Sequence, residues 1–161
     1  MFTDVNDRKK EVSLLAIQEK VLITPAEWEV MRVVWANGSL TSKEIQNILE
    51  EETGWKAATT KTFIGRLKDK DALSAEKEGR QYIYSAAVTE RESMKEELAL
   101  SFDKVCNQKV GAYLNDYVQT AALSQSDIHL LIETLESKLE SAPLQIPCRC
   151  LEGQCNCQDC K

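Results

Sequence analysis

Three helix-forming segments followed directly by a short hairpin constrain this chain more than any other feature of its sequence. The first segment opens with Thr24-Pro25-Ala26-Glu27, in which threonine can cap the helix, proline suits its first position and glutamate can complete a capping box. Thr41-Ser42-Lys43-Glu44 repeats the capping box for a second helix, and a third helix is expected from about Ala57 to Lys70. Leu73–Tyr84 is expected to form two strands joined by a tight turn. This order, with a basic residue at the hairpin tip, predicts a winged helix-turn-helix.

The third helix carries several threonines, although threonine has poor intrinsic helix propensity. Phe63, Ile64 and Leu67 are expected to face inward, which would leave the hydroxyl and basic side chains outward. Small residues permit close approach to a major groove, and hydroxyls and lysine can reach bases or phosphates. Basic residues on the hairpin would neutralise backbone phosphates. The candidate DNA-binding residues are Thr59, Thr60, Lys61, Thr62, Arg66, Lys77 and Arg80. An ordinary helix start with a solvated basic face is the alternative.

The charge of the chain is distributed unevenly. The whole chain of 161 residues has a net charge of −6, which argues weakly against a nucleic-acid partner. Residues 56–80, however, hold seven basic residues against four acidic ones. A locally basic surface of this kind can bind a polyanion even in an acidic chain.

Beyond Val88 the pattern is helical, over about 89–106, 108–122 and 124–139. These helices are too few to bury their own apolar stripes, so a second copy of the chain is expected to cover them and form a homodimer. The candidate dimerisation residues are Leu98, Phe102, Tyr113, Tyr117, Ile128, Leu131 and Leu135.

Five of the six cysteines lie within the last fourteen residues. Cys148, Cys150, Cys155 and Cys157 form a CxCxxxxCxC motif, in which the intervening Leu151–Gln154 loop lets the two pairs fold toward each other. Four thiolates suit tetrahedral Zn²⁺, and the same soft ligands suit Cu⁺. Cys160 is a possible additional ligand. Disulfides or an inert tail are the alternatives.

The remaining cysteine and the single histidine are expected to be structural. Cys106 is spaced like the apolar face of its helix, so we expect it to be a core residue rather than a metal ligand. His129 lies between Ile128 and Leu130, where a surface or packing role is expected. No nucleophile–base pair stands out, so the chain is not expected to be an enzyme.

No apolar run approaches the roughly 18–20 residues of a membrane-spanning helix, and the first residues do not resemble a secretory signal. We therefore expect no membrane partner and a cytoplasmic location, where cysteines stay reduced. The predicted fold class is mainly α with a small β-hairpin. The predicted regions are an undecided N-terminal arm (1–22), a winged-helix DNA-binding domain (23–88), a helical dimerisation region (89–141) and a cysteine-rich metal-binding tail (142–161).

Several long motifs in order resemble the penicillinase-repressor (BlaI/MecI/CopY) family of bacterial winged-helix repressors, over roughly residues 22–140. The motifs are Thr24–Met31 with Trp35, Thr41–Ile45, Thr59–Thr62, Arg66-Leu67 and Glu76–Tyr84. The resemblance implies a recognition helix at about Ala58–Lys70, a wing at Leu73–Tyr84, and dimers that bind inverted repeats of double-stranded DNA. Many members carry a basic residue where this chain has Ala58, which puts one expected DNA contact in doubt.

The cysteine tail resembles that of the copper-responsive branch of the same family. The resemblance implies a repressor of copper-export genes that holds DNA in its zinc form and leaves it when Cu⁺ displaces Zn²⁺. A repressor that responds to another metal or to thiol oxidation is the alternative, as is a metal-storage or chaperone protein. Whether copper arrives free or from a partner chaperone stays open.

Overall fold

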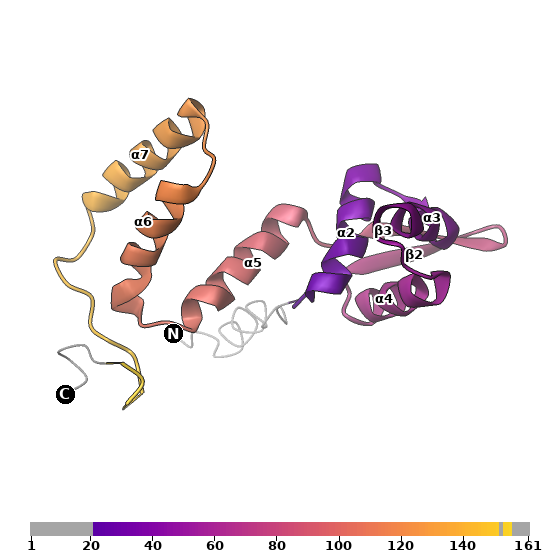
Figure 1. The fold of residues 1–161 in the computed structure, drawn as a ribbon, viewed down its shortest axis with the longest axis horizontal. Helices are drawn as coiled ribbons and strands as arrows, with labels where there is room; N and C mark the ends of the chain where they lie inside the picture. The colour runs from indigo at the N-terminus through magenta and orange to yellow at the C-terminus, as the bar shows by residue number, and fades with distance from the viewer. Residues whose placement is uncertain (1–20, 152, 156–161) are drawn as a thin grey trace, which may run out of the picture. The chain divides into compact units, whose positions relative to one another are not determined.

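The computed structural model describes residues 21–151 and 153–155 (Figure 1). Its packing divides the chain into two compact units after Glu97, within helix α5 (Glu90–Asp103). The first unit contains α2 (Pro25–Asn37), β1 (Leu40–Thr41), α3 (Ser42–Thr53), α4 (Ala57–Asp69), β2 (Leu73–Glu78) and β3 (Gln81–Ala86). The second contains the end of α5, a short 3-10 helix η1 (Asn107–Lys109), α6 (Val110–Thr120) and α7 (Gln125–Leu139). The region boundaries expected from the sequence stay predictions.

Both predicted capping boxes of the first unit are confirmed. The Thr24 backbone N–H donates to Glu27 Oε2 at 2.9 Å, and the Glu27 N–H donates back to Thr24 Oγ1 at 3.4 Å. Thr41 and Glu44 repeat this exchange at the start of α3, with distances of 2.7 and 3.2 Å. These bonds satisfy amide groups that the first turn of a helix leaves without partners, so each helix begins where its sequence predicts.

The predicted hairpin is also confirmed, and it belongs to a three-stranded antiparallel sheet with the order β1-β3-β2. Glu78 pairs with Gln81 across a turn in which Gly79 has a φ of +61°, a left-handed conformation that favours glycine. The sequence did not predict β1, because two residues are too few to show the alternation of a strand. β1 pairs with β3 through Leu40 and Tyr84 and so joins the start of α3 to the wing.

The core of the first unit lies where α2, α3, α4 and the sheet meet. Its buried residues are Ile23, Val30, Met31, Val34, Ile45, Leu49, Ile64, Leu67, Ala72 and Leu73. The Trp35 indole packs edge-on against Trp28, with ring centroids 5.1 Å apart, and donates a hydrogen bond to the Val88 carbonyl at 2.9 Å. This packing holds α4 and the wing in one body.

A buried ion pair joins the start of α2 to the end of α4. Glu27 is 1% exposed, and its Oε2 lies 2.6 Å from Lys70 Nζ, which also donates to the Leu22 carbonyl at 2.9 Å. Burial raises the pKa of Glu27, but hydrogen bonds from Lys70 and Thr24 outweigh burial and lower it overall. The carboxylate therefore stays charged and fixes the position of α4.

The second unit is packed differently. Cys106 is the one residue of the described range 98–155 that is buried, whereas large apolar side chains of α6 and α7 are exposed. Helix α5 ends at Asp103, before the predicted end near 106, so Cys106 lies in the turn before η1 and not on the apolar face of a helix. In the described part of the chain, no helix is long and apolar enough to cross a membrane.

The predicted fold class is confirmed in its architecture: a mainly helical winged-helix domain with a small antiparallel sheet, further helices and a C-terminal cysteine cluster.

Candidate nucleic-acid interface and metal centre

Helix α4 exposes most of the side chains predicted to face DNA, with one exception. Thr59, Lys61, Thr62 and Arg66 are exposed. Thr60 is fully buried, so the expectation that it faces outward is wrong. The reason is helical spacing, since Thr60 shares one face of α4 with Ile64 and Leu67, four and seven residues later. Its hydroxyl has no hydrogen-bond partner among the described residues.

Two of the exposed α4 side chains have partners within the helix. The Thr62 hydroxyl donates to the Ala58 carbonyl at 2.9 Å, which leaves its methyl group and oxygen lone pairs available. The Arg66 guanidinium lies over the Phe63 ring, 5.6 Å from its centroid, an arrangement that gives a cation–π attraction. Lys61, in the first half of the helix, takes part in neither of these two contacts.

The wing presents the two predicted basic residues to solvent. Lys77 is exposed on β2 and pairs in register with Tyr82, which is 50% exposed. Arg80 is exposed in the turn between β2 and β3. The paired strands therefore set the backbone positions from which the two cationic side chains extend.

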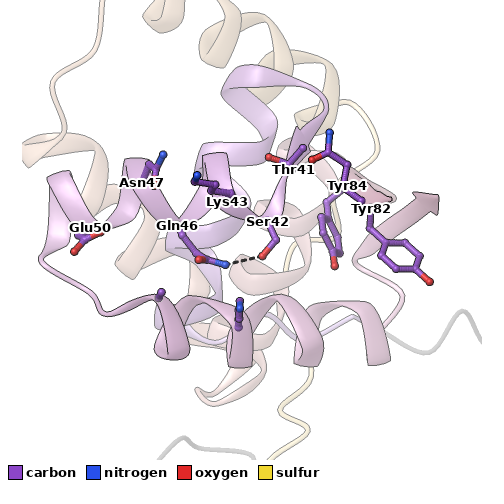
Figure 2. Close-up of a pocket in the computed structure, with 11 residues that line it drawn as sticks. Thr41, Ser42, Lys43, Gln46, Asn47, Glu50, Tyr82 and Tyr84 are labelled. Carbon is purple, nitrogen blue, oxygen red and sulfur yellow. Dashed lines mark hydrogen bonds between the residues drawn. The ribbon is translucent and has the colours of Figure 1, made fainter. Parts of the chain in front are cut away.

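A concave surface enclosing about 480 Å³ lies between α3, the first half of α4 and the wing (Figure 2). Gln46 and Ser42 of α3 face one another in it, and the Gln46 amide donates to the Ser42 hydroxyl at 2.7 Å. The lining residues are Thr41, Ser42, Lys43, Gln46, Asn47, Glu50, Ala57, Lys61, Gln81, Tyr82 and Tyr84. Most of these are hydrogen-bonding side chains, which suits contact with bases or phosphates.

Sequence reasoning missed the α3 part of this surface. Lys43, Gln46 and Asn47 are spaced three and four residues apart, so they lie on one face of the helix. The sequence did indicate this face, because these three polar residues lie opposite the buried Ile45 and Leu49.

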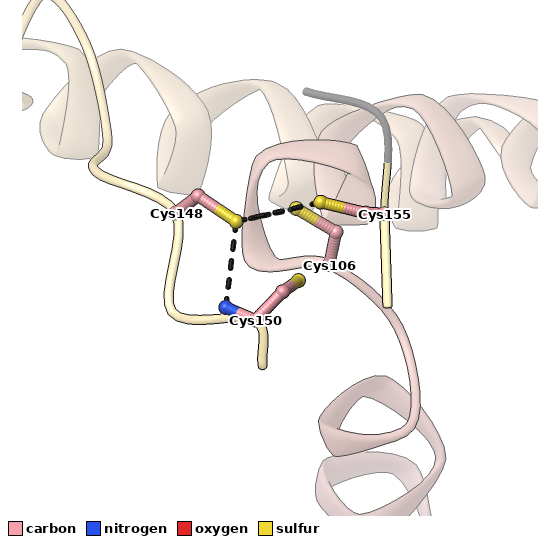
Figure 3. A group of neighbouring side chains, drawn as sticks. All are labelled: Cys106, Cys148, Cys150 and Cys155. Atoms are coloured by element: carbon pink, nitrogen blue, oxygen red, sulfur yellow. Dashed lines mark hydrogen bonds between the residues drawn. The ribbon is translucent and has the colours of Figure 1, made fainter. Parts of the chain in front are cut away.

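Four cysteine sulfurs converge in the second unit (Figure 3). The Sγ atoms of Cys106, Cys148, Cys150 and Cys155 all lie within 4.8 Å of one another. Cys148 Sγ is 3.5 Å from Cys106 Sγ and 3.6 Å from Cys155 Sγ. These separations far exceed the roughly 2.05 Å of a disulfide bond.

The local backbone explains how the tail brings its sulfurs together. Gln154 N–H donates to the Leu151 carbonyl at 3.0 Å, and the Leu151 N–H donates to Gln154 Oε1 at 2.9 Å. Gly153, with a φ of +81°, allows this tight turn. The chain reverses at this turn, as the spacing predicted, and Cys155 returns to Cys148. The Cys150 N–H also donates to Cys148 Sγ at 3.4 Å.

The donor set fits a metal that prefers sulfur. A tetrahedral Zn²⁺ with bonds of about 2.3 Å places its ligand sulfurs about 3.8 Å apart, close to the separations seen here. Hydrogen bonding with Cys148 raises the pKa of the Cys150 thiol, and burial and the other two cysteines add to this effect. Metal binding must therefore release protons, because the thiolate is the ligand.

The structure brings together three of the predicted tail cysteines, and it adds one that was not predicted. Cys157 and Cys160 lie outside the described residues. Cys106 was expected to pack in a core, but its sulfur lies beside the Cys148 sulfur, 3.5 Å away. No spacing rule links residues 42 positions apart, so this neighbour was not visible in the sequence.

His129 and the predicted dimerisation residues lie on the surface of the second unit. The His129 ring Nδ1 lies 2.8 Å from the Gln125 carbonyl, on an exposed face of α7. Phe102 is half-buried on α5, and the other six predicted residues are exposed: Leu98, Tyr113, Tyr117, Ile128, Leu131 and Leu135.

Residues 23–137 match the penicillinase repressor family. The chain is 40% identical to an uncharacterised 16.5 kDa protein from Latilactobacillus sakei over 84% of this chain and 93% of that protein. It is 28% identical to the penicillinase repressor of Bacillus licheniformis, over 71% of this chain and 89% of the relative. A solved structure of the CopR repressor is 44% identical, covers 40% of this chain and 93% of its own, and superposes with a TM-score of 0.36.

The chain belongs to the penicillinase repressor family. It is a winged-helix DNA-binding transcriptional repressor and not an enzyme, as the sequence predicted.

Proposed function

We propose that this repressor is copper-responsive: a homodimer in the zinc form binds an inverted-repeat operator of copper-export genes in the cytoplasm, and Cu⁺ releases it. The observation that carries the proposal is the convergence of four cysteine sulfurs within 4.8 Å, in a chain of repressor fold. Sulfur-only sites select Zn²⁺ and Cu⁺ over the harder cations.

On the DNA side, the exposed residues of α4 read the major groove and the wing contacts phosphates. Thr59, Lys61, Thr62 and Arg66 are exposed on one helix, which supports their assignment. Lys77 and Arg80 carry positive charge on the wing, where phosphate contacts would position the protein without specifying sequence. The α3 residues Lys43, Gln46 and Asn47 line the neighbouring concave surface and extend the contact.

The dimer is supported by the apolar surface of the second unit. Tyr117, Leu135 and Leu139 are 69%, 63% and 75% exposed, which is costly for side chains of this size in water. A second copy would remove this surface from water. Two-fold symmetry in the protein would then match an inverted repeat in the operator.

For the metal, we propose Cys148, Cys150 and Cys155 as ligands, with Cys157 the fourth ligand expected from the motif. Bound Zn²⁺ would tie these sulfurs into one closed centre, and Cu⁺, which accepts fewer sulfurs, would not reproduce that shape. A ~100-fold loss of DNA affinity requires ~2.7 kcal/mol of coupling between the two sites. This is small beside the roughly 10–16 kcal/mol of structural zinc binding.

The test is an anaerobic fluorescence-anisotropy titration of the zinc form onto an ACA…TGT inverted repeat, the type of site that the family resemblance implies, followed by addition of Cu⁺. We expect specific binding that Cu⁺ reverses, and no binding to a scrambled duplex. The double variant Cys155→Ser/Cys157→Ser is expected to lose the copper response. Specific binding that ignores Cu⁺ would reject the copper signal and leave the repressor assignment intact.

Thiol oxidation is the second candidate signal, because Cys106 Sγ and Cys148 Sγ are 3.5 Å apart. It predicts DNA release by a mild thiol oxidant without added metal, reversed by a thiol reductant.

A further inference from the structure

We infer that the surface around Gly65, in the second half of α4, binds the sugar–phosphate backbone of one operator strand. Gly65 leaves room for the backbone, and Lys61 and Lys68, one on either side of it, supply positive charge. The inference rests on the proposed function, since it adds a phosphate contact to the DNA contact proposed for α4. Neither Gly65 nor Lys68 is among the DNA-binding residues predicted from the sequence.

The first argument is a glycine that the packing of the protein does not require. Gly65 is exposed within α4, and four helical residues follow it. Glycine inside a helix lowers the stability of the helix relative to alanine. A Cβ atom added at Gly65 would meet no atom within 4 Å among the described residues, so no neighbour demands a glycine. Glycine also lets a ligand approach the backbone closely, and the space beside Gly65 is open to one.

The second argument is a hollow of about 300 Å³ that Gly65 lines. Ser42 at the start of α3 and Tyr84 of β3 line the same hollow. Both residues, together with Lys61, also line the larger concave surface between α3, α4 and the wing (Figure 2). The two hollows therefore adjoin along one flank of α4. A continuous depression of this kind suits an extended polyanion, such as a DNA strand, better than a small anion.

The third argument is charge. Lys61, Gly65 and Lys68 are spaced four and three residues apart, so the glycine and both cations lie on one face of α4. At 1.5 Å per residue, the two lysines are about 10 Å apart along the helix. Asp69 also lines the hollow, and two lysines against one aspartate leave it positive. The ion pairs formed by the described residues involve neither lysine, so both can bind phosphates.

The consequence is a division of α4 into two flanks. Thr59 and Arg66, seven residues apart, share the other exposed flank. Phosphate contacts position a protein on DNA without reading its sequence. Gly65 would therefore set how closely α4 approaches the DNA, and a larger side chain there would hold the helix away from any sequence.

The experiment uses the full-length zinc-loaded protein with single changes at Gly65 and Lys68. Gly65→Ala adds one methyl group. We expect this change to stabilise the protein, with the equilibrium ratio of unfolded to folded molecules falling roughly two- to fivefold in urea unfolding. The same methyl group should weaken DNA binding roughly tenfold, because it occupies the space of the DNA backbone.

Lys68→Gln removes one proposed phosphate contact and should lower the slope of log affinity against log salt by about one. Fluorescence anisotropy over a salt series measures this slope on the inverted-repeat duplex and, at low salt, where sequence-independent binding is strong, on a scrambled duplex. Both duplexes should lose affinity by the same factor.

Two matched changes serve as controls. Gly111→Ala makes the same substitution at an exposed glycine of α6 whose added Cβ also meets nothing, and Lys95→Gln removes an exposed lysine of α5. Both should leave DNA affinity unchanged. Lower stability of Gly65→Ala, unchanged DNA affinity of Gly65→Ala, or an unchanged salt slope of Lys68→Gln would overturn the inference. None of these results would reject the copper-responsive repressor, because copper-driven release is measured with the wild-type protein.

Discussion

The two units of this repressor are built on different physical principles. The winged unit buries ten apolar residues in one continuous core and fixes α4 with an ion pair whose carboxylate is buried. In the second unit, the one buried residue of the described range 98–155 is a cysteine, and large apolar side chains face solvent. The comparison teaches that the first unit carries its own stability, whereas the second buries too little to do so and, on the function proposed above, would be completed by a second copy and a metal.

The largest difference between the two units is expected when one leucine in each is truncated to alanine. Leu67→Ala removes a fully buried side chain from α4, so we expect a loss of about 2–5 kcal/mol in the free energy of unfolding. The matched change Leu135→Ala alters a side chain that is 63% exposed. It should weaken dimerisation instead and make unfolding more dependent on protein concentration. Urea unfolding at two protein concentrations checks both; equal behaviour of the two variants would contradict the comparison.

The buried ion pair should give the winged unit a dependence on pH. The pKa of Glu27 is lowered from its ordinary value of 4.5, so its contribution is present above pH 4.5 and is lost as the pH falls through the lower folded value. Glu27→Gln keeps the shape of the side chain and removes its charge. We expect a cost of about 1–3 kcal/mol at pH 7.

The cost of Glu27→Gln should shrink below pH 4.5. Thermal unfolding of the wild type and the variant from pH 7 to 3 measures it. Since Glu44 forms a similar capping box with an exposed carboxylate, Glu44→Gln is the control, with a smaller effect expected. A difference between wild type and Glu27→Gln that does not change with pH would contradict the prediction.

Tail docking in the second unit should depend on Asn107. Asn107→Ala removes two hydrogen bonds to the tail without removing a sulfur. At about 0.5–1.5 kcal/mol for each bond, zinc affinity should fall roughly 5- to 160-fold. The number of thiolate ligands seen with Co²⁺ should not change. Competition with a chromophoric chelator measures the affinity, and His129→Ala, on exposed α7, serves as the control.

The smallest expected effect concerns the threonine that the structure places in the core. Thr60→Val replaces a buried hydroxyl that has no partner among the described residues, so we expect unchanged stability or a gain of about 1 kcal/mol. DNA affinity should be retained. Thr59→Val, one residue earlier and exposed, should instead weaken DNA binding. If Thr60→Val weakened DNA binding more than Thr59→Val, the conclusion that Thr60 lies in the core and away from DNA would be wrong.

The same contrast separates what sequence could predict from what it could not. The capping boxes at Thr24 and Thr41 and the hairpin turn at Gly79 are local, so a few consecutive residues specify them. Thr60 was predicted to face outward together with its neighbouring threonines. Its spacing of four and seven residues from Ile64 and Leu67, which places it on the buried face of α4, was not considered.

The cysteine cluster was predicted only as far as its parts are local. The turn at Gly153 joins Cys148 to Cys155 within one short segment, which spacing alone could indicate. Cys106 belongs to the cluster through tertiary folding, and the bonds of Asn107 and Gln108 to the tail have no local pattern.

The separation of Cys106 from Cys148 also bears on how the protein is made. A ribosome completes the winged unit, with its own core, before it reaches the tail. A nascent chain thus acquires its DNA-binding surface first. A site that needs both cysteines assembles only after α6 and α7 have been synthesised between them. On the function proposed above, operator binding would mature before metal sensing, and the cysteine cluster would be the last part of each new molecule to become competent.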